Sequence, residues 1–166
     1  MAKIVGIDPG LSGAMGFLDG MIYKTFDLPV TTGLDKQNVI DSHLVFDMLN
    51  DLRPEIIMFE LQQVQMITGK KTAFIMGRTY QSLLMGIEMY QNTFEVSVVS
   101  VRPQEWKKSL GLIAPKGSSS KAKKQITADF VKNVFPRAEI YTPRGRLLDG
   151  RSDALAIAEY ARRKYC

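Results

Sequence analysis

The sequence contains very few of the residues that form disulfides or bind soft metals. It has one cysteine, Cys166, and one histidine, His43, in 166 residues. A single cysteine excludes an internal disulfide and a cysteine-based metal site, and this low count is typical of the reducing cytoplasm. With a multi-histidine site also excluded, any metal is expected to be bound by oxygen atoms, which favours Mg²⁺ or Mn²⁺ over Zn²⁺.

Long hydrophobic segments are missing as well. No apolar run approaches the roughly 20 residues that a membrane-spanning helix needs. The first residues, MAKIVGID, lead directly into a strand pattern without the features of a signal peptide. The length and the 45% of apolar residues suit one compact domain over residues 1–166. We therefore expect a cytoplasmic, single-domain protein that does not span a membrane.

Basic residues are in excess and unevenly placed. The net charge is +5, and residues 102–125 contain a single acid, Glu105. The basic residues of this segment are Arg102, Lys107, Lys108, Lys116, Lys121, Lys123 and Lys124, and residues 137–151 add Arg137, Arg144, Arg146 and Arg151. A clustered basic surface is typical of a nucleic-acid-binding protein. A solvated, lysine-rich helix would give the same composition, so composition alone leaves both interpretations open.

Hydrophobic patterning predicts an α/β protein. Strands are expected over 3–8, 13–19, 21–28, 55–60 and 95–101, and helices over 36–51, 70–91, a short stretch after 102, 121–134 and 150–164. The Asp19-Gly20 pair between two apolar runs predicts a hairpin. This order indicates a mixed five-stranded sheet with helices on both faces, in which the first three strands form an antiparallel meander and the later strands run parallel to the first.

Acidic residues stand where three of these elements end or begin. Asp8 ends the first strand, Glu60 ends the fourth, and Asp149 and Asp153 share one face of the last helix if that helix starts by Asp149. Because the carboxyl ends of parallel strands meet at one sheet edge, we expect these acids to converge there. Each also has an ordinary alternative as a turn residue, a strand end or a helix cap.

A convergent group of acids has a definite chemical meaning. Like charges about 4 Å apart repel by several kcal/mol in a partly desolvated site. A divalent cation relieves that repulsion, and two Mg²⁺ ions roughly 4 Å apart can activate a water and stabilise the leaving oxygen of a phosphodiester. The predicted chemistry is metal-dependent phosphodiester hydrolysis.

Together these segments resemble a known family. The stretches GIDPGLSGAMG and DGRSDALAIAEYA, the Glu60 that closes an apolar strand, and the lysine-rich segment near 107–124 resemble the RuvC family of Holliday junction resolvases over nearly the whole chain. The resemblance implies an RNase H-like fold, a homodimer and Mg²⁺-dependent nicking of four-way DNA junctions. It also implies that Asp8, Glu60, Asp149 and Asp153 bind the metals.

The resemblance further implies roles for basic residues. It selects Lys107 and Lys121 as catalytic, next to the scissile phosphate. The remaining candidates are DNA-binding residues, namely Lys70, Lys71, Arg78, Lys108, Lys116, Lys123 and Lys124, and for Arg78 a contact with the partner subunit of the dimer is the alternative. For Trp106, we weigh core packing against stacking on a DNA base.

The chain departs from the family pattern at several positions. Asp149 and Asp153 are four residues apart where the family usually has a spacing of three, and no aromatic residue follows Glu60 before Phe74. The lack of an aromatic residue between Glu60 and Phe74 favours relaxed selectivity among junctions, forks and flaps. Residues 62–73, which include Gln62, Gln63 and Gln65, form either a loop that enters the junction centre or a solvated connection.

Two other functions stay open at this point. The segment GIDPGLSG also resembles the phosphate loop of the actin-like and sugar-kinase ATPases, although those proteins pair two such domains. The other alternative is a non-catalytic module that binds branched DNA. The acids speak against such a module, because they weaken DNA binding unless a metal is present.

Overall fold

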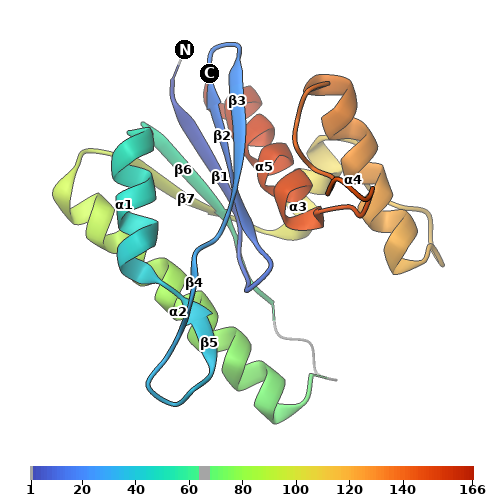
Figure 1. The fold of residues 1–166 in the computed structure, drawn as a ribbon. Coiled ribbons are helices and arrows are strands. Elements are labelled where there is room, and N and C mark those ends of the chain that lie inside the picture. Colours follow the sequence, from blue (N-terminus) through green and yellow to red (C-terminus); the bar gives the residue numbers. More distant parts are fainter. Residues whose placement is uncertain (1, 64–67) are drawn as a thin grey trace.

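The computed structural model describes residues 2–63 and 68–166, and its centre is a five-stranded mixed sheet. The strands are β1 (Ile4–Asp8), β2 (Ala14–Asp19), β3 (Ile22–Asp27), β6 (Ile56–Glu60) and β7 (Ser97–Val101), in the order β3-β2-β1-β6-β7. Strands β1, β2 and β3 form an antiparallel meander, while β6 pairs in parallel with both β1 and β7 (Figure 1). The predicted fold class is confirmed.

Helices cover both faces of this sheet (Figure 1). Helices α1 (Ser42–Leu52) and α2 (Lys70–Thr93) pack against one apolar cluster that includes Val5, Ile7 and Ile57. Helices α3 (Pro103–Ser109), α4 (Ser120–Val134) and α5 (Asp149–Tyr165) pack on the other face, against a cluster that includes Ile4 and Met58. Since alternate strand residues point to opposite faces, each buried strand contributes side chains to both clusters.

The predicted helix over 36–51 is wrong in its first part. Residues 38–40 belong to a small second sheet, in which β4 (Val30–Thr32) pairs with β5 (Asn38–Ile40). Val39 and Ile40 are buried, and β-branched residues of this kind favour a strand. Helix α1 begins only after Asp41, whose carboxylate accepts hydrogen bonds from the backbone N–H groups of His43 and Leu44. This Asp cap sets the true start of the helix.

Helix α5 lies unusually close to the sheet. A Cβ atom at Gly6 of β1 would lie 2.3 Å from the carbonyl oxygen of Ala154, and one at Gly16 of β2 would lie 2.6 Å from the backbone nitrogen of Leu155. Only glycine permits such an approach of helix and strand backbones. These two glycines therefore fix the depth of α5 on the sheet and, with it, the position of the acids at its N-terminus.

No helix in residues 2–63 and 68–166 is long and apolar enough to cross a membrane.

Candidate active site

The strand-borne acids, Asp8 and Glu60, lie on the same face of the sheet as α5. Ile4 and Met58 belong to the cluster under α5, and the two-residue period of a strand carries Asp8 and Glu60 to that face. Ile7 and Phe59 are paired in the β1–β6 ladder, one residue before each acid. The structure therefore brings the two carboxylates to adjacent strand ends, as the sequence predicted.

The helix-borne acids approach from the N-terminus of α5. This helix begins at Asp149, so Asp149 and Asp153 stand one turn apart on it. A Cβ atom at Gly150 would lie 2.4 Å from the carbonyl oxygen of Ser12 and 3.3 Å from Oδ2 of Asp8. The first turn of α5 thus rests directly on the turn after β1, beside the Asp8 carboxylate.

Electrostatic coupling joins the four acids. Burial, followed by the negative charges of Asp153, Glu60 and Asp149, raises the pKa of Asp8 well above its usual value. Burial also raises the pKa of Glu60 and that of Asp153. The folded chain therefore holds these carboxylates in a place that disfavours their charged forms.

Two lysines partly neutralise this group. Nζ of Lys107 lies 3.6 Å from Oδ2 of Asp153, and Nζ of Lys124 lies 2.6 Å from Oδ2 of Asp149. The hydrogen bond to Asp149 raises the pKa of Lys124. The acids still outnumber these two lysines, and a bound cation would stabilise their charged forms.

Trp106 is a site residue whose contact the sequence did not reveal. Its side chain is fully buried, which confirms core packing and rules out stacking on a base. Its indole Nε1 donates a hydrogen bond of 2.7 Å to Oε2 of Glu60. The only signal in the sequence was the position of this single tryptophan immediately before Lys107.

The donor set fits a hard divalent cation by its chemistry. Four carboxylates from three elements are the oxygen ligands that Mg²⁺ and Mn²⁺ prefer, and burial followed by the neighbouring acids raises the pKa of Asp8. As they stand, however, no group of three or more Asp, Glu, His or Cys residues in the described chain is arranged to hold a metal ion. The chemistry of the donor set, rather than a preformed cluster, is what points to a divalent cation here.

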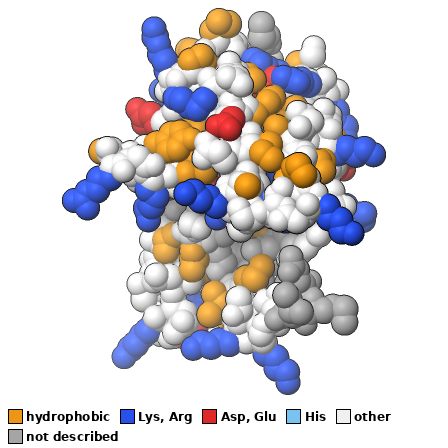
Figure 2. Space-filling view, turned by 90° about the vertical axis from the view of Figure 1, so that its right-hand side faces the viewer, with side chains coloured by type: hydrophobic (Ala, Val, Ile, Leu, Met, Phe, Trp, Pro, Cys, Tyr) orange, Lys and Arg blue, Asp and Glu red, His pale blue; other side chains and the backbone are white. Residues whose placement is uncertain are grey.

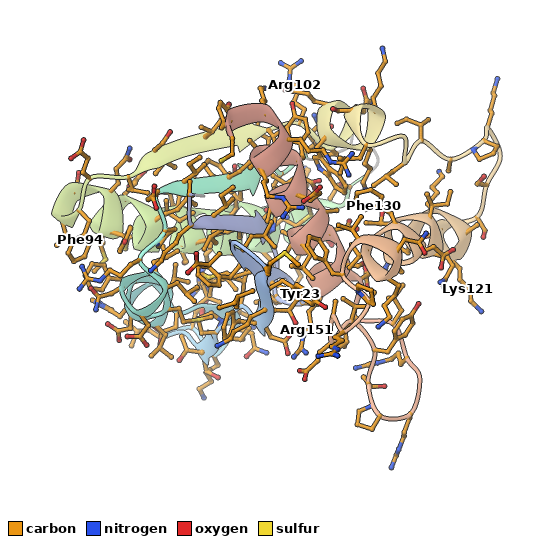
Figure 3. All side chains as sticks on the ribbon, turned by 90° about the horizontal axis from the view of Figure 1, so that it is seen from above. Tyr23, Phe94, Arg102, Lys121, Phe130 and Arg151 are labelled. Carbon is orange, nitrogen blue, oxygen red and sulfur yellow. The ribbon has the colours of Figure 1, made fainter. Side chains whose placement is uncertain are left out.

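The other basic candidates surround this site without converging on it. Lys121 is exposed and lies at the outer end of α4, away from the sheet (Figure 3). It lines a groove with Lys124, Arg146 and Asp149, so Lys124 is the α4 lysine that touches an acid of the site. The catalytic role of Lys121 stays a prediction, and Lys124 gains a role beyond a DNA-backbone contact.

The remaining predicted DNA-binding residues are spread more widely. Lys108, Lys116 and Lys123 are exposed on or near α3 and α4. Figure 2 views the side of the molecule that carries α4 and shows Lys and Arg side chains over much of it, with few acids between them. Lys70 and Lys71 are exposed at the start of α2, whereas Arg78 on that helix pairs with Asp35 of the β4–β5 hairpin. Their DNA contacts stay predictions.

Arg151 is next to the site but is occupied by a structural contact. Its guanidinium donates hydrogen bonds of 2.7 and 2.8 Å to the carboxylate of Asp27 in β3 and a third to the carbonyl oxygen of Glu139. The bond to Arg151 lowers the pKa of Asp27. This arginine therefore fastens the start of α5 to the edge of the sheet.

The loop after Glu60 is only partly described. Gln62 is partly buried and Gln63 is exposed, while Gln65 lies outside the described residues. Entry of this loop into a junction centre stays a prediction.

Comparisons with known proteins identify the fold. No family model matches the sequence, and no match is found among curated proteins. A solved structure of Thermus thermophilus RuvC with a Holliday junction substrate is similar, with a TM-score of 0.60, 17% identity and coverage of 99% of this chain and 97% of that chain. A second T. thermophilus RuvC structure has a TM-score of 0.57 and 20% identity, with 98% and 96% covered.

A yeast mitochondrial Holliday junction resolvase, Ydc2, extends this likeness. Its TM-score is 0.50 at 13% identity, and the alignment covers 96% of this chain and 77% of that chain. The predicted resemblance is therefore confirmed at the level of the fold, which the present chain shares over nearly its whole length.

Proposed function

We propose that this chain is a divalent-metal-dependent endonuclease that nicks branched DNA, chiefly four-way junctions. The observation that carries the proposal is the group formed by Asp8, Glu60, Asp149 and Asp153, which are coupled to one another beside Lys107 and Lys124. Its RuvC-like fold supports the same substrate, since one similar structure holds a Holliday junction.

The four acids would hold Mg²⁺, or Mn²⁺, with two ions per site. When bound, the metal supplies an activated water and neutralises charge on the phosphate under attack. Asp8 and Glu60 come from the rigid sheet, and Asp149 and Asp153 from a helix fixed on it by two glycines. Such rigid supports limit the cost of orienting a reacting phosphate.

The lysines have separate tasks in this proposal. Lys107 is only one-third exposed and reaches Asp153, so it is placed to bind a non-bridging oxygen of the scissile phosphate. Lys124 is half exposed and holds Asp149. It would exchange this carboxylate for a DNA phosphate when the cation arrives. Lys121 and Arg146 extend the same groove and would follow the DNA backbone.

We further propose that residues 1–166 act as one catalytic domain in a homodimer in the cytoplasm. Two sites related by a two-fold axis match the symmetry of a four-way junction and would nick opposed strands at equivalent positions. The lack of an aromatic residue between Glu60 and Phe74 predicts that forks and flaps are also cut.

A panel of end-labelled four-way junction, fork, flap and linear duplex tests the proposal in Mg²⁺. We expect paired, symmetric nicks in the junction, weaker cutting of forks and flaps, and none in the duplex. Asp8→Asn should abolish the products, whereas Asp19→Asn, the same change at the end of β2, should leave them unchanged. Junction binding without any Mg²⁺-dependent product would indicate a binding module, and stabilisation by ATP would indicate a nucleotide-binding protein.

A further inference from the structure

The hydrogen bond between Trp106 and Glu60 joins a buried core residue to the candidate metal site. Trp106 packs in the cluster that includes Met58, Val101 and Ala156 and has no exposed surface. A buried indole N–H needs an acceptor. Here the acceptor is the Glu60 carboxylate, at a donor–acceptor distance of 2.7 Å.

This bond holds one oxygen of Glu60 and leaves the other available. Trp106 binds Oε2, and the hydrogen bonds found within residues 2–63 and 68–166 include no other to this carboxylate. A neutral donor fixes the rotation of a carboxylate without cancelling its charge. By contrast, Asp149 and Asp153 are each paired with a lysine cation. Glu60 is thus presented to an incoming cation in a fixed orientation, with a neutral donor rather than a cation bonded to its carboxylate.

Helix α3 couples this contact to the acids of α5. The next residue, Lys107, places its Nζ 4.8 Å from the centre of the Trp106 ring and 3.6 Å from Oδ2 of Asp153. Successive helical residues point about 100° apart, so one helix turn serves acids from two separate elements. Oε1 of Glu105 accepts a 2.8 Å hydrogen bond from the Tyr160 hydroxyl, which fastens α3 to α5.

We infer that Trp106 is a positioning residue that orients Glu60 for cation binding, and that α3 links Glu60 to Asp153 through the adjacent residues Trp106 and Lys107. The inference rests on the proposed function for its role in catalysis, but its effect on cation binding stands apart from any cleavage. The residue also provides its own probe, because it is the only tryptophan in the chain.

The first experiment measures Trp106 fluorescence in the full chain without DNA while Mg²⁺ is added. Because the indole N–H is bonded to a proposed ligand, we expect a saturable change in emission for the wild-type protein. Glu60→Gln should abolish that change, whereas Glu55→Gln, at the opposite end of β6, should not. The inference would be overturned if the wild-type emission did not change with Mg²⁺, or if Glu60→Gln showed the same change as the wild type.

The second experiment removes the donor and keeps an aromatic ring. Residues that orient metal ligands typically contribute 10- to 100-fold to metal affinity. In Trp106→Phe, we therefore expect the Mg²⁺ concentration needed for half of the Mg²⁺-induced rise in melting temperature to increase by roughly 10-fold or more. The same increase is expected in the Mg²⁺ dependence of junction cleavage, with the maximal rate largely restored at saturating Mg²⁺ and junction affinity in EDTA unchanged.

Phe135→Leu is the matched control, because Phe135 lies in the same buried cluster and its ring contacts Tyr23 and the guanidinium of Arg162. It should lower the melting temperature without changing the Mg²⁺ requirement. Equal shifts in Trp106→Phe and Phe135→Leu, or none in Trp106→Phe, would overturn the positioning role. If Mg²⁺ binding depends on Trp106 as expected while no branched DNA is cut, the inference survives and only the proposed nuclease function fails.

Discussion

The two faces of the central sheet differ in what they bury. The face covered by α1 and α2 is packed with apolar side chains, and Thr79 is the buried polar residue from its helices. The face covered by α3, α4 and α5 buries Thr127, Ser152 and Glu159 and also carries Asp8 and Glu60. Burial of charge costs stability unless the charge is paired. Both faces therefore stabilise the fold through an apolar cluster, and the face under α3, α4 and α5 gives up part of that stability for a charged site.

The largest effect is expected for Asp8→Asn on the charged face. Loss of a proposed ligand should lower junction cleavage by at least about 100-fold, the upper range for residues that only support ligands. The same change removes a buried, repelled charge, so the metal-free protein should melt at a higher temperature at neutral pH. Cleavage assays and thermal melts in EDTA measure the two effects. If Asp8→Asn cleaved junctions and melted at a lower temperature than wild type, the proposed difference between the two faces would be contradicted.

The pH dependence of that stability gain follows from the raised pKa of Asp8. A raised carboxyl pKa means that the folded chain binds the proton more tightly than the unfolded chain does. The contribution of Asp8 to stability is then lost as the pH rises from its usual pKa of 3.8 through the raised value. The melting-temperature difference between Asp8→Asn and wild type should therefore widen as the pH is raised from 3.8 to neutral. A difference that is constant across this range would refute the electrostatic cause.

A smaller effect is expected from one glycine on each face. At Gly150, a Cβ would lie 2.4 Å from the carbonyl oxygen of Ser12, so Gly150→Ala should cost about 1–3 kcal/mol and displace the acids of α5. At Gly77 of α2, nothing lies within 4 Å of an added Cβ. Gly77→Ala should therefore raise the free energy of unfolding by up to about 1 kcal/mol. Urea denaturation of both variants measures these changes, and equal effects would show that α5 is not closely seated.

The smallest effects are expected for substitutions of two basic residues, Lys107 and Arg78, which lie on opposite faces of the sheet. Lys107→Ala should lower the cleavage rate with little change in the salt dependence of junction binding, because Lys107 acts within the site. Arg78→Ala should change stability by less than about 1 kcal/mol, since its pair with Asp35 is exposed. If Arg78 also contacts DNA, the slope of log binding constant against log salt should fall by about one. Binding titrations at several salt concentrations decide between these outcomes.

The sequence predicted the parts of this site that depend on strand ends and helix periodicity. Asp8 and Glu60 follow apolar runs whose parallel pairing brings their ends together, and the spacing of Asp149 and Asp153 placed both on one side of α5. The structure shows that Lys124, rather than Lys121, reaches Asp149. Which of the two lysines faces the acid depends on the rotation of α4 about its axis. No local pattern encodes such a rotation.

The contacts that could not be predicted join segments far apart in the chain. Trp106 and Glu60 are 46 residues apart, and their hydrogen bond depends on where α3 packs. The β4–β5 hairpin was missed because Val39 and Ile40 also fit the spacing of the helix that follows them. A short apolar run is ambiguous in this way until its packing partners are known.

Anomalous diffraction from crystals soaked in Mn²⁺ tests the central claim most directly. The account predicts one or two anomalous peaks bound by Asp8, Glu60, Asp149 and Asp153, which Asp8→Asn removes. Crystals saturated with Mn²⁺ that show no peak at these carboxylates, or a peak only elsewhere on the molecule, would contradict it.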